Sequence, residues 1–329
     1  MPSYLQSLLL AVTTIYHAIA CWLEDKNPPP GQLIDMGDYK LHLYEKHSYS
    51  QSKGSPTVIL EHSLGGIEGY FLIDELAKIG RVCIYDRAGF GWSDISPHSR
   101  TSENMVIELD RLLQKAGIEP PYILVGDSFG TYNARLYARR FPQKVVGMVL
   151  TDGLHESGML KMSFGLQVLK YFFASGFVMS VFGSILGIIR IFKMLGIFEL
   201  LKPELRKFPR HTRQYVIRSF CRPKHWLTMA QEILNLDTSS KQVIVANNFG
   251  ELPIVNIQAN SFFKPAFWTN FIPLQSANQL RETMHEELMQ LSTNCTQIQA
   301  HNSGHFVWID EPEIMVTAVR IILEKVETM

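Results

Sequence analysis

Runs of apolar residues alternate with segments of helical periodicity along most of this 329-residue chain. Most of the runs are continuous, which is typical of strands that are buried on both faces of a parallel sheet. Strands are expected at residues 39–47, 57–62, 81–86, 122–127, 145–152, 253–259 and 296–301, and helices at 68–78, 102–115, 129–140 and 276–291 and from Pro312. This order predicts an α/β fold in which helices cover both faces of a mostly parallel, doubly wound sheet.

Composition and charge exclude several classes of protein. Hydrophobic residues make up 46% of the chain, charged residues make up 19%, and the formal net charge is zero. These values indicate neither a disordered chain nor a nucleic-acid-binding protein. The cysteines have no CxxC pair and no metal-like spacing to histidine, so neither a disulfide framework nor a zinc site is expected at Cys21, Cys83, Cys221 and Cys295.

The N-terminal segment contains no charged side chain before Glu24. Its apolar residues recur at helical spacing: Leu5, Leu8, Val12, Ile15, Ile19 and Trp22. Three interpretations compete, namely a membrane-associated helix, a signal peptide that lacks the usual basic start, and a helix packed on its own domain. The proline-rich residues 28–31 then indicate a stiff linker to the folded core.

A second uncharged stretch, residues 171–189, is also long enough to span a membrane. The strand patterns on both sides of it must join one sheet, and a single crossing would leave half of the sheet on each side of a bilayer. We therefore expect an apolar helical cap that packs on the core and that could also insert into the surface of a lipid bilayer. The sequence predicts a hydrophobic helix at 1–26, an α/β core at 27–153 and 250–329, and a helical cap at 154–249.

The stretch VGDSFG places Ser128 between Gly126 and Gly130, after an apolar strand and before a helix. In that context the G-x-S-x-G pattern is typical of a nucleophile, because the sharp turn lifts the serine hydroxyl above the sheet. Glycine is needed on either side, since a Cβ atom would clash in so tight a turn. The alternative is a glycine turn that merely contains a serine, and only partners elsewhere in the chain distinguish the two.

A serine nucleophile needs a base, and His305 is the leading candidate among eleven histidines. It lies in a loop after the last expected strand, which opens at the same carboxyl edge of the sheet as Ser128. His301 is the alternative, but it ends that strand and is expected to pack. The histidine needs an acid to orient it; residues 260–280 contain none, whereas an earlier strand ends in Asp152. We therefore expect Ser128, His305 and Asp152 to form a triad.

These motifs resemble those of the α/β-hydrolase superfamily from Thr57 to the C-terminus. Besides the elbow and the SGHF loop, the segment DRAGFGWSD at 86–94 is similar to the D-x-x-G-x-G-x-S loop after that family's fourth strand. The resemblance implies an α/β-hydrolase fold with an inserted cap. It also implies an oxyanion hole formed by the backbone N–H groups of Leu64 and Phe129.

The chain departs from the family pattern at two places. Ser63 replaces the glycine of the family's His-Gly-x loop, which affects the expected geometry of the backbone at Leu64. In addition, the expected orienting acid, Asp152, follows the sixth strand, whereas the usual position of this acid in the family is after the seventh strand.

The resemblance implies a serine hydrolase that cleaves a carboxylic ester through an acyl-enzyme intermediate, without a metal or an organic cofactor. Haloalkane dehalogenases and epoxide hydrolases of this fold carry an aspartate at the elbow, where this chain has Ser128. The alternatives are an acyltransferase or an aminopeptidase of the same fold, and a catalytically silent, membrane-tethered binding protein.

The expected partners are a small-molecule ester or lipid, and a membrane contacted through residues 1–23 and the apolar cap; no nucleic acid is expected. The expected cap is rich in apolar residues, and two interpretations of them remain open. They could bind an acyl chain or a membrane-delivered ester, or they could only pack the cap on the core. The residues are Phe172, Phe173, Phe177, Met179, Phe182 and Ile185. The expected location is the membrane, or otherwise the cytoplasm.

Overall fold

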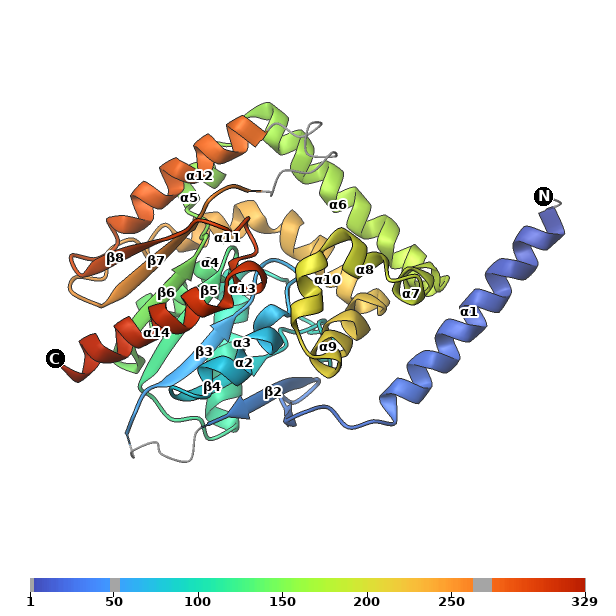
Figure 1. Ribbon diagram of the computed structural model, residues 1–329, viewed down its shortest axis with the longest axis horizontal. Coiled ribbons are helices and arrows are strands. Elements are labelled where there is room, and N and C mark those ends of the chain that lie inside the picture. The colour runs from blue at the N-terminus through green and yellow to red at the C-terminus, as the bar shows by residue number, and fades with distance from the viewer. Residues whose placement is uncertain (1–2, 48–53, 263–273, 329) are drawn as a thin grey trace.

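The computed structural model describes residues 3–47, 54–262 and 274–328. Their strands form one eight-stranded sheet in the order β1-β2-β4-β3-β5-β6-β7-β8 (Figure 1). β2 runs antiparallel to β1 and β4, and the other neighbouring pairs are parallel. The strands are β1 Gln32–Asp35, β2 Lys40–Lys46, β3 Thr57–Glu61, β4 Arg81–Tyr85, β5 Tyr122–Asp127, β6 Val145–Thr151, β7 Ile254–Ala259 and β8 Cys295–Ala300. The predicted mostly parallel, doubly wound sheet is thus confirmed.

The apolar pattern of the sequence does not predict β1. This strand lies at the edge of the sheet, where it pairs only with β2 among the described strands. Within it, Ile34 is half-buried and the other three residues are exposed. A short edge strand needs no continuous apolar run, so the signal that identifies the central strands is missing here.

Two apolar cores cover the two faces of the sheet, because successive side chains of a strand point to opposite sides. In β3, Ile59 belongs to one core, and Val58 and Leu60 belong to the other. The first core is covered by α3 Ser102–Lys115, α4 Gly130–Arg140 and α12 Leu274–Met289. The second is covered by η1 Glu68–Phe71, α2 Ile73–Leu76, α13 Val307–Asp310 and α14 Pro312–Glu327. Burial on both faces makes the sheet a rigid support for the loops at its carboxyl edge.

A series of helices connects β6 to β7. They are α5 Glu156–Met159, α6 Phe164–Ile185, α7 Ile188–Met194, α8 Ile197–Leu201, η3 Pro203–Lys207, α9 Arg210–Phe220, α10 Pro223–Leu234 and α11 Leu236–Val243, while the short η2 Pro142–Lys144 precedes β6. The division of the chain into an N-terminal helix, a core and a cap stays a prediction.

Helix α6 packs on α10, but most of its apolar side chains are exposed to solvent. Burial along α6 is confined to Lys170, Ala174 and Ser184. The residues expected either to receive an acyl chain or to pack the cap on the core instead lie largely on the surface: Phe172, Met179, Phe182 and Ile185 are exposed, and Phe173 and Phe177 are half-buried.

Helix α1, Ser3–Asp25, projects away from the sheet (Figure 1). Its large apolar side chains are exposed over most of its length: Tyr4, Leu5, Leu8, Leu9, Leu10, Val12, Ile15, Tyr16, Ile19, Trp22 and Leu23. Ion pairs fasten its C-terminal end, from Glu24 to Arg190 at 2.6 Å and to Arg222 at 3.0 Å, and from Asp25 to Arg218 at 2.7 Å. By length and composition, both α1 and α6 could cross a membrane.

Candidate active site

The turn between β5 and α4 forces Ser128 into a strained conformation. The φ angle of Ser128 is +49°, in the left-handed region that non-glycine residues rarely adopt. A Cβ atom on Gly130 would lie 2.2 Å from the carbonyl oxygen of Glu61, and one on Gly126 would lie 2.7 Å from that of Gly130. Both glycines are therefore required by close backbone contacts, and the strained serine between them is typical of a nucleophile elbow.

The structure brings the three predicted triad residues together at the carboxyl edge of the sheet. His305 Nε2 lies 2.9 Å from Ser128 Oγ, and His305 Nδ1 lies 2.6 Å from Asp152 Oδ2. Ser128 and Asp152 are buried, while the His305 side chain is 13% exposed. His301, the alternative base, is exposed and has no hydrogen bond to Ser128 or Asp152 in the described part of the chain. The arrangement allows a proton to pass from the hydroxyl to the imidazole.

Asp152 is surrounded by hydrogen-bond donors. Its Oδ1 accepts from the backbone N–H of Ala259 at 3.1 Å, from His285 Nε2 at 3.0 Å and from Arg281 at 3.3 Å. Burial alone would raise the pKa of Asp152, but the hydrogen bonds from His285 and His305 and the charge of Arg281 outweigh it and lower that pKa. The carboxylate therefore stays ionised beside the imidazole that it orients.

The sequence analysis predicted no role in the site for Arg281 and His285. Both are buried, lie four residues apart on α12 and therefore share one face of that helix. This i, i+4 pair of polar residues on an otherwise core-facing stripe is the signal that could have identified them.

The two expected oxyanion donors are free to bind a ligand. Neither the N–H of Leu64 nor that of Phe129 has a hydrogen-bond acceptor among the described residues. Both belong to buried segments, one after β3 and the other after β5, that flank Ser128 in the parallel sheet. Unpaired buried N–H groups are rare in folded proteins, and at this place they could stabilise a developing negative charge.

A buried ion pair fixes the loop that carries Leu64. Arg87 donates to the carbonyl oxygens of His62 and Ser63, each at 2.7 Å, and also to the Glu232 carboxylate at 2.9 Å. Glu232, on α10, in turn accepts from the N–H of Gly65 at 2.9 Å. The loop is thus held on both sides of Leu64, by the loop after β4 and by a helix of the β6–β7 connection.

The Ser63 substitution is accommodated in this loop. Its hydroxyl lies 3.4 Å from the carboxyl group of Glu68, which is buried. Burial raises the pKa of Glu68 and raises the pKa of Asp127 well above its usual value. Burial therefore disfavours the charged form of both neighbouring acids.

No group of three or more His, Cys, Asp or Glu side chains is placed to hold a metal ion in residues 3–47, 54–262 and 274–328. The four cysteines are free thiols and form no disulfide.

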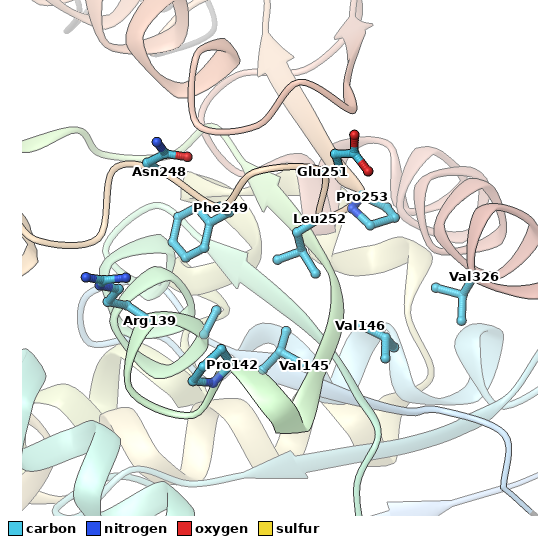
Figure 2. A pocket seen from close by; sticks show the side chains of 11 residues that line it. Arg139, Pro142, Val145, Val146, Asn248, Phe249, Glu251, Leu252, Pro253 and Val326 are labelled. Atoms are coloured by element: carbon cyan, nitrogen blue, oxygen red, sulfur yellow. The ribbon is translucent and has the colours of Figure 1, made fainter. Parts of the chain in front are cut away.

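A cavity of about 660 Å³ is lined by none of the residues of this site. Figure 2 shows the side chains that line it. It is lined by Val145 at the start of β6, by Leu252 and Pro253 just before β7, and by Val326 of α14. The amino ends of parallel strands lie at the sheet edge opposite to Ser128, so this cavity is not where a substrate would meet the serine.

Comparisons with known proteins agree with the fold. The model of the alpha/beta hydrolase fold matches residues 56–247. YqjL, an uncharacterised protein of Bacillus subtilis, is 26% identical over 235 residues, which are 71% of this chain and 70% of the relative. An uncharacterised vacuolar membrane protein of Saccharomyces cerevisiae is 36% identical over 121 residues, which are 34% of this chain and 18% of the relative.

Solved structures show the same architecture. An esterase from Thermogutta terrifontis superimposes with a TM-score of 0.62 at 18% identity, covering 91% of this chain and 99% of its own, and an epoxide hydrolase also shares the fold. At this level of identity the likeness shows the fold alone. The family match, however, covers more than half of the chain and includes the Ser128 elbow. The chain therefore belongs to the α/β-hydrolase family.

Proposed function

We propose that this protein is a serine hydrolase that cleaves a carboxylic ester through an acyl-enzyme intermediate. The main support for the proposal is the continuous set of hydrogen bonds from Ser128 through His305 to Asp152, next to two backbone N–H groups that have no acceptor among the described residues. A serine at the elbow favours acyl transfer over the epoxide opening of relatives that use an aspartate there.

The reaction follows from the positions of these groups. His305 Nε2 takes the proton of Ser128 as Oγ attacks the ester carbonyl carbon, and the Asp152 carboxylate stabilises the imidazolium. The N–H groups of Leu64 and Phe129 bind the oxyanion, each contributing about 3 kcal/mol. The imidazolium then gives its proton to the leaving alcohol. Water attacks the acyl-enzyme by the same route, so the acid is released and Ser128 recovers its proton.

The substrate we propose is a lipophilic ester that reaches the enzyme from a membrane. Two long apolar helices, α1 and α6, leave most of their large apolar side chains exposed in the described part of the chain. Helix α6 packs on α10, which carries Glu232 and so contacts the loop of Leu64. A bilayer bound to α6 would thus lie one helix away from the oxyanion loop. The yeast relative's description as a vacuolar membrane protein supports a membrane location.

Replacing Ser128 with Ala tests the nucleophile. We expect ester hydrolysis to fall by at least about a thousandfold, because no other group takes over the attack. Labelling of the intact protein by a fluorophosphonate should also disappear in a gel assay. Ser175→Ala, an exposed serine on α6, serves as the matched control and should behave as wild type. Labelling that persists in Ser128→Ala would remove Ser128 from its proposed role.

The acyl-chain preference tests the lipophilic substrate. We expect kcat/KM on p-nitrophenyl esters to rise from acetate to decanoate, by up to about fourfold for each methylene that becomes buried. The series is measured below the critical micelle concentration, with Ser128→Ala as the blank. A profile that is flat or falls with chain length would contradict a lipophilic acyl site.

Removal of residues 1–26 tests the membrane contact. We expect the full chain to sediment with membranes and to be released by detergent but not by high salt, because the contact is mainly apolar. Deletion should increase the soluble fraction, and the part that still sediments is attributed to the remaining exposed helix α6. The double variant Glu24→Gln/Asp25→Asn breaks the ion pairs at the end of α1 but keeps its apolar residues, and it should still sediment. A full chain that is soluble throughout would show that α1 binds no membrane.

A further inference from the structure

We propose that His285 and Arg281 of α12 are positioning residues, which hold the Asp152 carboxylate and set the pH range in which His305 accepts a proton. This inference rests on the proposed function, because it concerns how the same triad is tuned. It adds two residues that contact neither the nucleophile nor the base in the hydrogen bonds of the described chain.

The two oxygens of Asp152 have different partners. Oδ2 receives His305 Nδ1 at 2.6 Å, whereas Oδ1 receives His285 Nε2 at 3.0 Å together with the Ala259 N–H at 3.1 Å. Arg281 lies 3.3 Å from Oδ1 and 3.4 Å from Oδ2. One side of the carboxylate therefore faces the base, and the other side is fixed by donors from β7 and α12.

His285 is itself held in one orientation. A carboxylate only accepts hydrogen bonds, so Nε2 of His285 must carry the hydrogen that Asp152 receives. Its Nδ1 lies 3.1 Å from Asn256 Nδ2 and 3.2 Å from Asn256 Oδ1, so the Asn256 amide can pair with this nitrogen whether it accepts or donates a hydrogen bond. Asn256 is fully buried on β7. The chain Asn256–His285–Asp152 thus mirrors, on the far side of the acid, the chain that leads through His305 to Ser128.

This support compensates for the position of the acid. Asp152 directly follows β6 at a φ angle of +39°, a conformation that costs free energy for a residue with a side chain. The seventh strand contributes no acid, but it provides Asn256 and the N–H and carbonyl groups of Ala259, the latter bound by Arg281 at 2.9 Å. β7 and α12 together thus hold the acid that the seventh strand does not carry.

The charges of Asp152 and Arg281 determine the direction in which removal of Arg281 shifts the pH dependence of the reaction. The negative charge of Asp152 stabilises protonated His305, and the positive charge of Arg281 opposes that stabilisation. Two further acids interact electrostatically with the triad, Glu68 and Asp127, and burial raises the pKa of each and so disfavours its charged form. Removing Arg281 leaves the carboxylate uncompensated, so His305 holds its proton to a higher pH. The limb on which activity rises with pH must then move to higher pH.

The test is the pH dependence, from pH 5 to 9, of the second-order rate of fluorophosphonate labelling of the full chain. For Arg281→Met we expect the rising limb to move up by about one pH unit. For Arg281→Lys, which keeps the charge, we expect a limb close to that of wild type. Glu282→Gln, an exposed acid on the same helix, is the matched control and should leave the profile unchanged.

His285 is tested in the same assay. We expect His285→Leu to slow labelling about tenfold, the effect of losing one hydrogen bond to a charged group, and to move the limb upward. His285→Gln, which restores an N–H donor, should recover most of the rate. Melting temperatures identify variants that fail to fold, and Arg281→Lys and His285→Gln keep the test informative in that case.

The outcomes separate this inference from the proposed function. If folded Arg281→Met and His285→Leu keep the wild-type pH profile, or lose rate equally at every pH, the two residues do not tune His305 and the inference fails. If the wild-type chain itself is not labelled at Ser128, the proposed function fails instead.

Discussion

The Asp152 carboxylate is the contact on which the geometry of the site depends, because it joins parts of the chain that are distant in sequence. It follows β6, accepts from the backbone of β7 and from α12, and orients the histidine of the loop after β8. A buried carboxylate is costly unless its oxygens are paired, and here donors surround it. The low pKa that results keeps the charge in place, so the orientation of His305 and its hydrogen bond to Ser128 follow from the packing of β6, β7 and α12.

The buried ion pair of Arg87 and Glu232 holds the loop of Leu64 in place, as Asp152 holds His305. Such a pair contributes little net stability by itself, because two charges lose their hydration. Its additional hydrogen bonds reach the backbone on both sides of Leu64, so it serves to position the loop. Because Glu232 belongs to α10 and α10 packs on the exposed α6, the loop, the buried pair and the proposed membrane contact form one connected structure.

The sequence predicts the central strands and the convergence of Ser128, His305 and Asp152, because strand order and sheet edges follow from local patterns. It misses β1, whose edge position needs no apolar run. It predicts that α6 is apolar but does not distinguish packing on the core from contact with an acyl chain or a membrane, and the structure exposes most of the apolar residues of this helix. The contacts of the supporting residues are harder to predict. The i, i+4 spacing of Arg281 and His285 marks them as unusual polar residues on α12, but it does not indicate that His285 contacts Asp152, 133 positions away in the sequence. Glu232 contacts Arg87 across 145 positions, and no local pattern predicts that contact.

The most direct measurement for this account is a crystal structure of the full chain after reaction with a small fluorophosphonate. The phosphonyl oxygen of the adduct stands in for the oxyanion of the tetrahedral intermediate. We expect phosphorus bonded to Ser128 Oγ, its oxygen within hydrogen-bond distance of the Leu64 and Phe129 N–H groups, and His305 still hydrogen-bonded to Asp152. Phosphorus on another residue, or an oxygen directed away from both N–H groups, would contradict it.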